Sequence, residues 1–183
     1  MRTSRSLQLG SLILALAFLT ACGVRSQVKK EDLGTLKGNT RFERVLFKDF
    51  TVAPNVTPPP MGLSIARESS IEYLRGRGMF QQVDKFTEGG ATAGSAIVEA
   101  HLTAVRLVSG TARFWGGVFA GRSHMQMNVK LTDGATGATI AEQELMGAPN
   151  AWASAYSMGH ADRELPAAMG ALIGDFVLAN SRK

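Results

Sequence analysis

Two neighbouring stretches in the second half of the chain alternate between apolar and polar residues. The first stretch runs from Ser123 to Asp133, and the second ends at Gly147 after the turn sequence DGATG. A period of two indicates a strand with one buried face, because successive side chains point to opposite sides. The predicted inward set is Met125, Met127, Val129 and Leu131, and the outward set is His124, Gln126, Asn128 and Lys130. These residues predict an antiparallel hairpin with one face open to water.

The rest of the domain predicts three further strands and two helices. Apolar runs or alternation indicate strands over residues 44–53, 79–86 and 96–108, and apolar residues at helical spacing indicate helices over 63–78 and from about 165 onward. The first helix has the stripe Leu63, Ala66, Ser70 and Leu74, with Gly76 and Gly78 at its end, and the second has Leu165, Met169, Leu172, Ile173, Phe176 and Val177. Both stripes have the width of a face that packs on a sheet.

The order of these elements defines the expected fold class. It reads strand, helix, strand, a meander of strands, and helix, which predicts an α+β domain. We expect a mostly antiparallel sheet of about five strands with two helices packed on one face. Residues 44–183 form one domain in this interpretation, because no repeat or linker divides them.

The N-terminal residues have the layout of an export signal. Arg2 and Arg5 precede an uncharged apolar run that ends at Ala21, and this run is shorter than the roughly 20 residues that a spanning helix needs. The sequence Leu-Thr-Ala-Cys that ends at Cys22 resembles the lipobox of bacterial lipoproteins, in which the cysteine is acylated and becomes the first mature residue. The alternative is a free cysteine at the end of a membrane helix, which the short apolar run disfavours.

The lipobox divides the N-terminal part of the chain in two. Residues 1–21 are the expected lipoprotein signal peptide, and residues 22–43 are the acylated cysteine with a flexible tether. The resemblance implies a membrane-anchored location in the cell envelope, facing the periplasm, and Gly23 after the cysteine favours the outer membrane. Since Cys22 is the only cysteine, the domain contains no internal disulfide and depends on its core for stability.

The excess of basic residues belongs to the leader and the tether. Without Arg2 and Arg5 the chain has 18 basic and 15 acidic residues, and the stretch from Arg25 to Arg44 holds six basic and three acidic ones. Beyond Val45 the two signs are equal, with 12 residues of each. The folded domain is therefore neutral overall, which disfavours nucleic acid as a partner, whereas the basic tether suits anionic lipid headgroups.

The sequence FWGGVFAGRS, from Phe114 to Ser123, resembles a phosphate-binding loop but lacks its context. Gly116, Gly121 and Arg122 fall where GxxxxGK[ST] has two glycines and a lysine. In such a loop a helix follows and directs its N-terminal N–H groups at the phosphate. Here an alternating strand follows, so we expect no nucleotide and interpret the glycines as a long hairpin apex or bulge.

Aromatic residues gather in two irregular segments. Phe114, Trp115 and Phe119 lie in the glycine-rich segment, and Trp152 and Tyr156 lie between residues 147 and 159. If these rings are exposed, they form an apolar surface suited to a partner protein or a membrane. The alternative is that they fold back over an open edge of the domain and belong to its core.

The polar side chains offer few patterns that are typical of catalysis. Glu99 and His101 share one strand face, and His124 belongs to the polar face of the neighbouring strand. A small cluster of these three side chains on the polar sheet face is therefore one alternative. His160 and Glu164 lie one helical turn apart, which is equally typical of a charged first turn. Because no GxSxG, HExxH or paired-cysteine pattern is present, we expect no enzyme, no metal and no cofactor.

The mature chain resembles the bacterial lipoprotein family called domain of unknown function 4410. The resemblance is carried by a basic residue before a glycine-rich segment, an alternating strand, a D-x-x-T-G turn and a returning strand. The matching positions are Arg113, Gly116, Gly117, Gly121, Asp133, Thr136 and Gly137. The opening RVLFKDFTVAP and the helix LSIARESSIEYLRGRGMFQQV also fit the family. The resemblance implies no catalytic residue.

These observations predict a lipid-anchored lipoprotein with a non-catalytic domain. Its expected partners are the membrane, through the lipid on Cys22, and either another envelope protein or a second copy of itself. The alternative is a periplasmic enzyme or small-ligand-binding protein that uses the polar sheet face around Glu99, His101 and His124.

Overall fold

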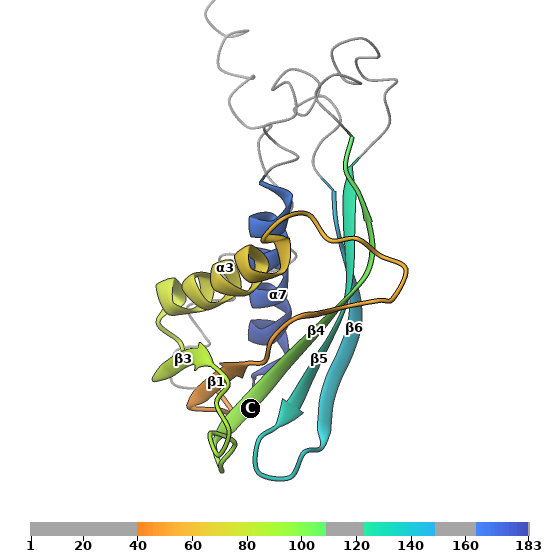
Figure 1. The fold of residues 1–183 in the computed structure, drawn as a ribbon. Helices are drawn as coiled ribbons and strands as arrows, with labels where there is room; N and C mark the ends of the chain where they lie inside the picture. Colours follow the sequence, from red (N-terminus) through yellow and green to blue (C-terminus); the bar gives the residue numbers. More distant parts are fainter. Residues whose placement is uncertain (1–39, 109–122, 149–163, 183) are drawn as a thin grey trace, which may run out of the picture.

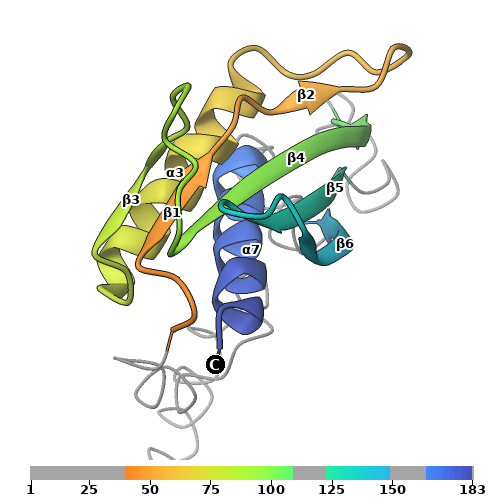
Figure 2. The ribbon, with the colours of Figure 1, turned by 90° about the horizontal axis from the view of Figure 1, so that it is seen from below.

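The computed structural model describes residues 40–108, 123–148 and 164–182, which form one sheet with two helices on one of its faces (Figure 1, Figure 2). The strand order is β3-β1-β4-β5-β6, and β2 pairs with β4 outside this path to complete six strands in the described chain. The elements are β1 (Arg44–Phe47), β2 (Thr51–Val52), α3 (Gly62–Arg77), β3 (Gln82–Lys85), β4 (Ser95–Arg106), β5 (His124–Asp133), β6 (Thr139–Gly147) and α7 (Leu165–Asn180). The α+β class is confirmed.

The sheet is mixed, so the expectation of a mostly antiparallel sheet is wrong. β1 pairs in parallel with β3 on one side and with β4 on the other, and β2 also runs parallel to β4. The helix α3 connects β1 to β3, and a helical crossover returns the chain to the end from which it started, which makes the two strands parallel. The antiparallel pairs β4–β5 and β5–β6 are confirmed.

The apolar run over residues 44–53 forms two short strands instead of one. β1 ends at Phe47 after four residues, and β2 resumes at Thr51 for two residues that pair with His101 and Leu102. The side chains of Phe47 and Phe50 are both buried, and their ring centroids are 6.3 Å apart. Burial of both rings explains why hydrophobicity alone predicted one continuous strand.

The helix α3 begins and ends at residues with left-handed backbone angles. Met61 precedes the helix with φ 56°, and Gly78 follows it with φ 62°. Gly78 is one of the two glycines expected to end the helix, and its N–H donates to the carbonyl of Arg75 over 3.0 Å. Gly76 instead lies within the helix on its exposed side, so it does not terminate the helix.

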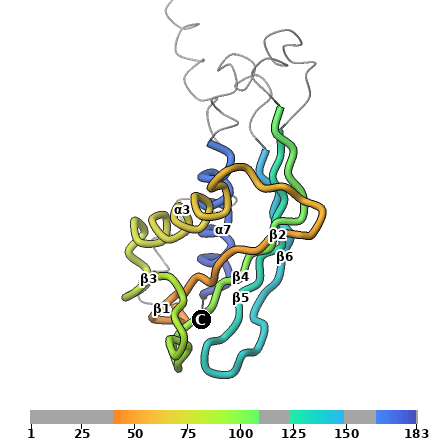
Figure 3. The backbone as a smooth tube through the Cα atoms, in the orientation of Figure 1, coloured from red at the N-terminus to blue at the C-terminus, as the bar shows by residue number. Residues whose placement is uncertain are grey.

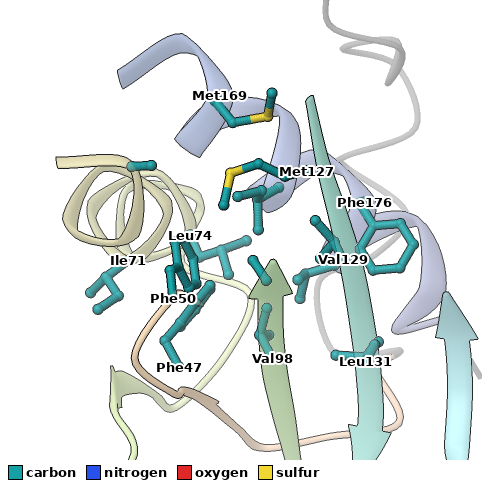
Figure 4. Close-up of a cluster of buried hydrophobic side chains, with 14 of the residues drawn as sticks. Phe47, Phe50, Ile71, Leu74, Val98, Met127, Val129, Leu131, Met169 and Phe176 are labelled. Carbon is teal, nitrogen blue, oxygen red and sulfur yellow. The ribbon is translucent and has the colours of Figure 1, made fainter. Parts of the chain in front are cut away.

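The core lies between the sheet and both helices. Side chains from α3, β1, β4, β5 and α7 converge there, among them Met127, Met169 and Leu74 (Figure 4). All four residues predicted to point inward from the first alternating stretch are fully buried, and the residues between them are half-buried on the opposite face. The alternation therefore separates a helix-covered face from a face open to water.

The two helices approach each other through glycines of α7. A Cβ atom at Gly170 would lie 2.5 Å from the carbonyl oxygen of Ala66 and 2.9 Å from the backbone nitrogen of Ser70. One turn later, a Cβ atom at Gly174 would lie 2.4 Å from Cδ1 of Tyr73. The backbone of α7 therefore packs directly against α3, and this contact fixes the helical layer over the sheet.

Polar groups of both helices meet at one side of this contact. The Tyr73 hydroxyl donates a hydrogen bond to the buried Asp175 carboxylate, and the Arg77 guanidinium donates to the Tyr73 oxygen over 2.6 Å. Burial, followed by the hydrogen bond to Asp175, raises the pKa of Tyr73. The phenol is therefore held neutral and protonated, and it joins α3 to α7.

The turn Asp133 to Gly137 gives a structural role to the D-x-x-T-G sequence. Oδ1 of Asp133 accepts hydrogen bonds from the backbone N–H groups of Ala135 and Thr136, each over 2.9 Å, and from the Thr136 hydroxyl over 3.1 Å. Gly137 has φ 70°, which suits a residue without a Cβ atom. The motif therefore closes the β5–β6 hairpin.

These hydrogen bonds predict a pH dependence for the turn. The N–H and hydroxyl of Thr136, followed by the N–H of Ala135, hold the pKa of Asp133 below its ordinary value of 3.8. A carboxyl group whose pKa is lowered by folding stabilises the folded state fully when the pH is above its ordinary pKa. This stabilisation is lost as the pH falls through the lower pKa of the folded state. We therefore expect Asp133→Asn to flatten the acid limb of the unfolding free energy below about pH 4. An unchanged acid limb in urea titrations of this variant would contradict the assignment.

Candidate functional site

The face of the sheet opposite the helices carries a polar cleft of about 300 Å³. It lies where the segment after β1 passes β4 and β5. Its lining residues are Lys48, Asp49, Thr51, Glu99, Ala100, His101, Asn128 and Lys130. The structure therefore places Glu99 and His101, two of the three side chains singled out in the sequence, in one cleft.

Charged groups in the cleft are largely matched by neighbours of opposite sign. Lys48 forms an ion pair with Glu99, and Asp49 forms one with Arg67 of α3. Lys130 lies opposite Glu99 in the β4–β5 register and opposite Glu142 in the β5–β6 register. Cross-strand pairs of opposite charge stabilise a sheet. The row of charges across this face therefore has a structural role.

His101 has one hydroxyl neighbour and no further catalytic partner in the described ranges. Its Nδ1 lies 2.8 Å from Oγ1 of Thr51, which is hydrogen-bonding distance. Activation of a hydroxyl by histidine normally needs a third group that orients the imidazole. Within residues 40–108, 123–148 and 164–182, no carboxylate bonds to the other ring nitrogen, and no group of three His, Cys, Asp or Glu residues could hold a metal ion.

The third side chain of the predicted polar cluster lies elsewhere along the sheet. His124 pairs with Arg106, whereas His101 pairs with Asn128. The four-residue step from His124 to Asn128 along β5 corresponds to about 13 Å at the usual rise of a strand. The structure therefore separates His124 from Glu99 and His101, although all three belong to the polar face.

A second hollow of about 230 Å³ lies at the edge of the sheet between β6 and α7. Its lining residues are Gln143, Glu144, Leu145, Met146, Leu172, Asp175, Phe176, Ala179 and Asn180. We call this hollow the β6–α7 groove. Met146 at its rim has 65% of its surface exposed, whereas Asp175 has only 4% exposed. The groove was not predicted, because the periodicity of β6 and α7 does not reveal how far apart they pack.

Both aromatic segments are attached at the same end of the sheet. Arg106 pairs with His124 across the first segment, and the N–H of Val108 donates to the Ser123 hydroxyl over 2.9 Å. β6 ends at Gly147 beside Leu165, where α7 begins, which brackets the second segment. In Figure 3 these strand ends and the start of α7 lie together at the top.

The predicted partner residues themselves lie outside the described residues. These are Phe114, Trp115, Phe119, Trp152 and Tyr156, together with the lipidation site Cys22. Their exposure therefore stays a prediction. The described chain begins at the opposite end of the sheet, where Thr40 bridges to Arg182 and Arg41 donates its N–H to the carbonyl of Ser181 over 2.8 Å. Among the described helices, neither is long and apolar enough to cross a membrane.

A two-layer fold with a mixed sheet, both helices on one face and a polar opposite face defines a small α+β domain. The chain belongs to the family described as a domain of unknown function, DUF4410, whose profile matches residues 64–175. The match extends from the first turns of α3 to the middle of α7. The family resemblance seen in the sequence is thus confirmed. No curated protein matches this sequence.

Solved structures of low sequence identity share the fold. The PelC dodecamer from Paraburkholderia phytofirmans is 13% identical, and the match covers 79% of this chain and 91% of that chain with a TM-score of 0.54. A PelC variant from the same organism, also a dodecamer, is 13% identical over 79% of this chain and 90% of that chain, with a TM-score of 0.53. At this identity the likeness is one of fold alone.

Proposed function

We propose that this chain is a lipid-anchored lipoprotein of the bacterial cell envelope whose α+β domain is a non-catalytic assembly module. Its partner in this proposal is a second copy of the same chain. The observation that carries the proposal is the fold shared with PelC, a protein solved as a dodecamer, over 79% of this chain. A domain of this fold can therefore present surfaces that associate repeatedly with one another.

The envelope location rests on the N-terminal sequence. The lipobox-like residues that end at Cys22 supply a site for acylation, and the stretch between Cys22 and Thr40 supplies a tether between the lipid and the domain. The expected tether boundary at residue 43 lies too late in the chain, because Phe42 is already buried in the core of the domain. Membership of DUF4410 is consistent with this location through the lipoprotein resemblance. We place the domain on the periplasmic side and favour the outer membrane because Gly23 follows the cysteine.

The absence of catalysis is an inference from the cleft chemistry. The cleft is lined by charged and polar side chains, yet its charges pair with one another across the strands. Thr51 and His101 form a hydroxyl–imidazole pair without an orienting carboxylate among the described residues. These features are typical of a solvated sheet face, so they support a structural role for Glu99 and Lys48.

Self-association is tested on the full-length protein purified from membranes in mild detergent. We expect light scattering coupled to size exclusion to give a protein mass that is a fixed multiple of the chain mass, over a tenfold range of loading concentration. A mass of one chain throughout that range would contradict the proposal. In that outcome, capture of a different envelope protein by cross-linking in intact cells would assign the module to another partner.

A further inference from the structure

Two methionines of the described chain have most of their surface in solvent, whereas three others are fully buried. Met61 is 75% exposed and Met146 is 65% exposed. Met125, Met127 and Met169 are each 0% exposed and belong to the core. Oxidation of a methionine requires contact between its sulfur and the oxidant, so exposure decides which of these side chains react. The fold therefore divides them into an accessible pair and a protected set.

The mature chain offers no free thiol that would react before the methionines. Cys22 is the only cysteine, and in the proposed function its sulfur is acylated. A thiolate reacts readily with peroxides, and an acylated sulfur does not form a thiolate. Met61 and Met146 are therefore the accessible oxidisable sulfur atoms that the described residues contain.

Met146 lies beside a hydrogen-bond donor that suits its oxidised form. In the β5–β6 register, Met146 is directly opposite Gln126, and side chains in such a pair have Cβ atoms about 5 Å apart. The side-chain amide of Gln126 has no hydrogen-bond partner within the described ranges, since only its backbone carbonyl accepts a bond, from Thr103. The thioether sulfur is a weak acceptor, whereas the amide can donate to the oxygen of a sulfoxide at position 146. Oxidation at this position therefore gains a partner on the neighbouring strand.

The surroundings of Met61 also accommodate an added oxygen. Met61 immediately precedes α3, and its side chain makes no capping hydrogen bond. The first turn of α3 contains no acidic residue, so no carboxylate of this turn balances the partial positive charge of its N–H groups. Oxidation converts the apolar side chain into a polar one with the negative end of the S–O bond on oxygen. The helix dipole therefore favours the oxidised form at this position.

The buried methionines lie in surroundings of the opposite kind. Met127 and Met169 pack among apolar side chains between the sheet and the helices (Figure 4). A sulfoxide there would bury a polar S–O bond among groups that donate no hydrogen bond, which is costly. Their sulfur atoms become accessible only when the fold opens. The folded domain therefore protects the methionines whose oxidation would damage it.

We propose that Met61 and Met146 are sites of reversible oxidation by peroxides, and that the domain keeps its fold when both are oxidised. A sulfur lone pair attacks one oxygen of hydrogen peroxide, so that the S–O bond forms and the O–O bond breaks. The released hydroxide takes the proton of the sulfur-bound hydroxyl and leaves as water. The thioether loses two electrons, and the peroxide gains them. A thiol-dependent sulfoxide reductase reverses the change, because two thiols become a disulfide and the oxygen leaves as water. This modification is independent of the proposed self-association.

The test uses the full-length protein in peroxide-free detergent, treated with hydrogen peroxide, stopped with catalase and digested for peptide mass spectrometry. Fragment ions assign each added oxygen to its residue. We expect Met61 and Met146 to react at rates close to those in the urea-unfolded protein. The buried Met125, Met127 and Met169 are expected to react at least about tenfold more slowly than in the unfolded protein. Equal rates for Met146 and Met127 in the folded protein would overturn the proposal.

Retention of the fold is the second readout. A sample oxidised at Met61 and Met146 is expected to keep its near-ultraviolet circular dichroism and its thermal midpoint, and to regain the parent mass with a sulfoxide reductase. Loss of the circular dichroism signal at a dose that spares Met127 would overturn the proposal. Met61→Leu combined with Met146→Leu is the matched control, because leucine keeps the apolar volume and cannot be oxidised. This variant should take up two oxygen atoms fewer than the parent at the same dose.

The part assigned to Gln126 has its own test, made in a Met61→Leu background so that Met146 is the one exposed methionine among the described residues. Gln126→Leu removes the amide that faces Met146. Oxidation at Met146 is then expected to lower the thermal midpoint by about 2 °C, whereas the protein with Gln126 shows no such loss. Equal shifts in the two proteins would overturn the assignment of Gln126, and the two oxidation sites would stand.

Discussion

Replacing Gly170 with alanine is expected to lower the unfolding free energy of the domain by about 3 kcal/mol, which is the upper range for overpacking of a tight contact. The added Cβ atom would lie 2.5 Å from the carbonyl oxygen of Ala66 and 2.9 Å from the backbone nitrogen of Ser70. Both obstacles belong to the backbone of α3, so no side-chain rotation relieves them. The helices must separate, and the core beneath them loses contact.

A matched control exists in the other helix. Gly76 lies within α3, and a Cβ atom there would meet nothing within 4 Å. Gly76→Ala should therefore raise the unfolding free energy by about 0.5 kcal/mol, because alanine is the better helix former. Urea unfolding followed by circular dichroism measures both changes. A loss below 1 kcal/mol for Gly170→Ala would show that α3 and α7 separate without cost to the core.

Gly174→Ala is a graded comparison within this experiment. Its added Cβ atom would lie 2.4 Å from a ring carbon of Tyr73, which belongs to a side chain and not to the backbone. The ring is restrained because its hydroxyl donates to Asp175. We therefore expect a loss smaller than that of Gly170→Ala but still clearly above the change at Gly76. The order of the three changes in unfolding free energy shows how far backbone contact, compared with side-chain contact, sets the packing of α7 against α3.

The antiparallel half of the fold was predictable because two local signals agree there. The inward methionines of β5 alternate with polar residues, and Asp133 and Gly137 have the chemistry that the turn requires. The parallel half was not predictable from the same signals. Parallel pairing depends on the path of a crossover helix, and the four-residue strands β1 and β3 are too short to carry a period.

The glycines of α7 show a second limit of the sequence. The stripe from Leu165 to Val177 predicted an apolar face, and it describes the residues that meet the sheet. It says nothing of the other face, where Gly170 and Gly174 meet α3. Glycine spacing of four residues indicates a close contact only when the position of a second helix is known.

The candidate site, too, was only partly predictable from the sequence. Alternation correctly assigned Glu99 and His101 to the polar face, because a strand period fixes the face of each side chain. It could not fix the position of His124 along that face, since the register between β4 and β5 shifts near Leu102. The β6–α7 groove depends on the spacing between a strand and a helix that are separated by residues 148–164 in the chain.

Replacing Cys22 with alanine is expected to abolish lipid attachment. Each buried methylene contributes about 0.8 kcal/mol to membrane binding, and a stable hold needs more than one acyl chain. The lipobox resemblance places those acyl chains on Cys22. Since the chain has no other cysteine, its loss leaves no second thiol for acylation. We therefore expect all incorporated lipid label to disappear.

Metabolic labelling with palmitate measures this result directly, and membrane fractionation follows the location of the protein. The label is the decisive readout, because an uncleaved leader could hold the Cys22→Ala precursor at a membrane without any acyl chain. Gly23→Ala is the matched control, since it keeps the cysteine and changes only the next residue. It should retain the label. Two results would contradict the lipid anchor: a Cys22→Ala protein that still carries the label, or one that persists as an unchanged membrane-bound mature species. The proposed self-association of the α+β domain does not depend on the anchor and would still stand.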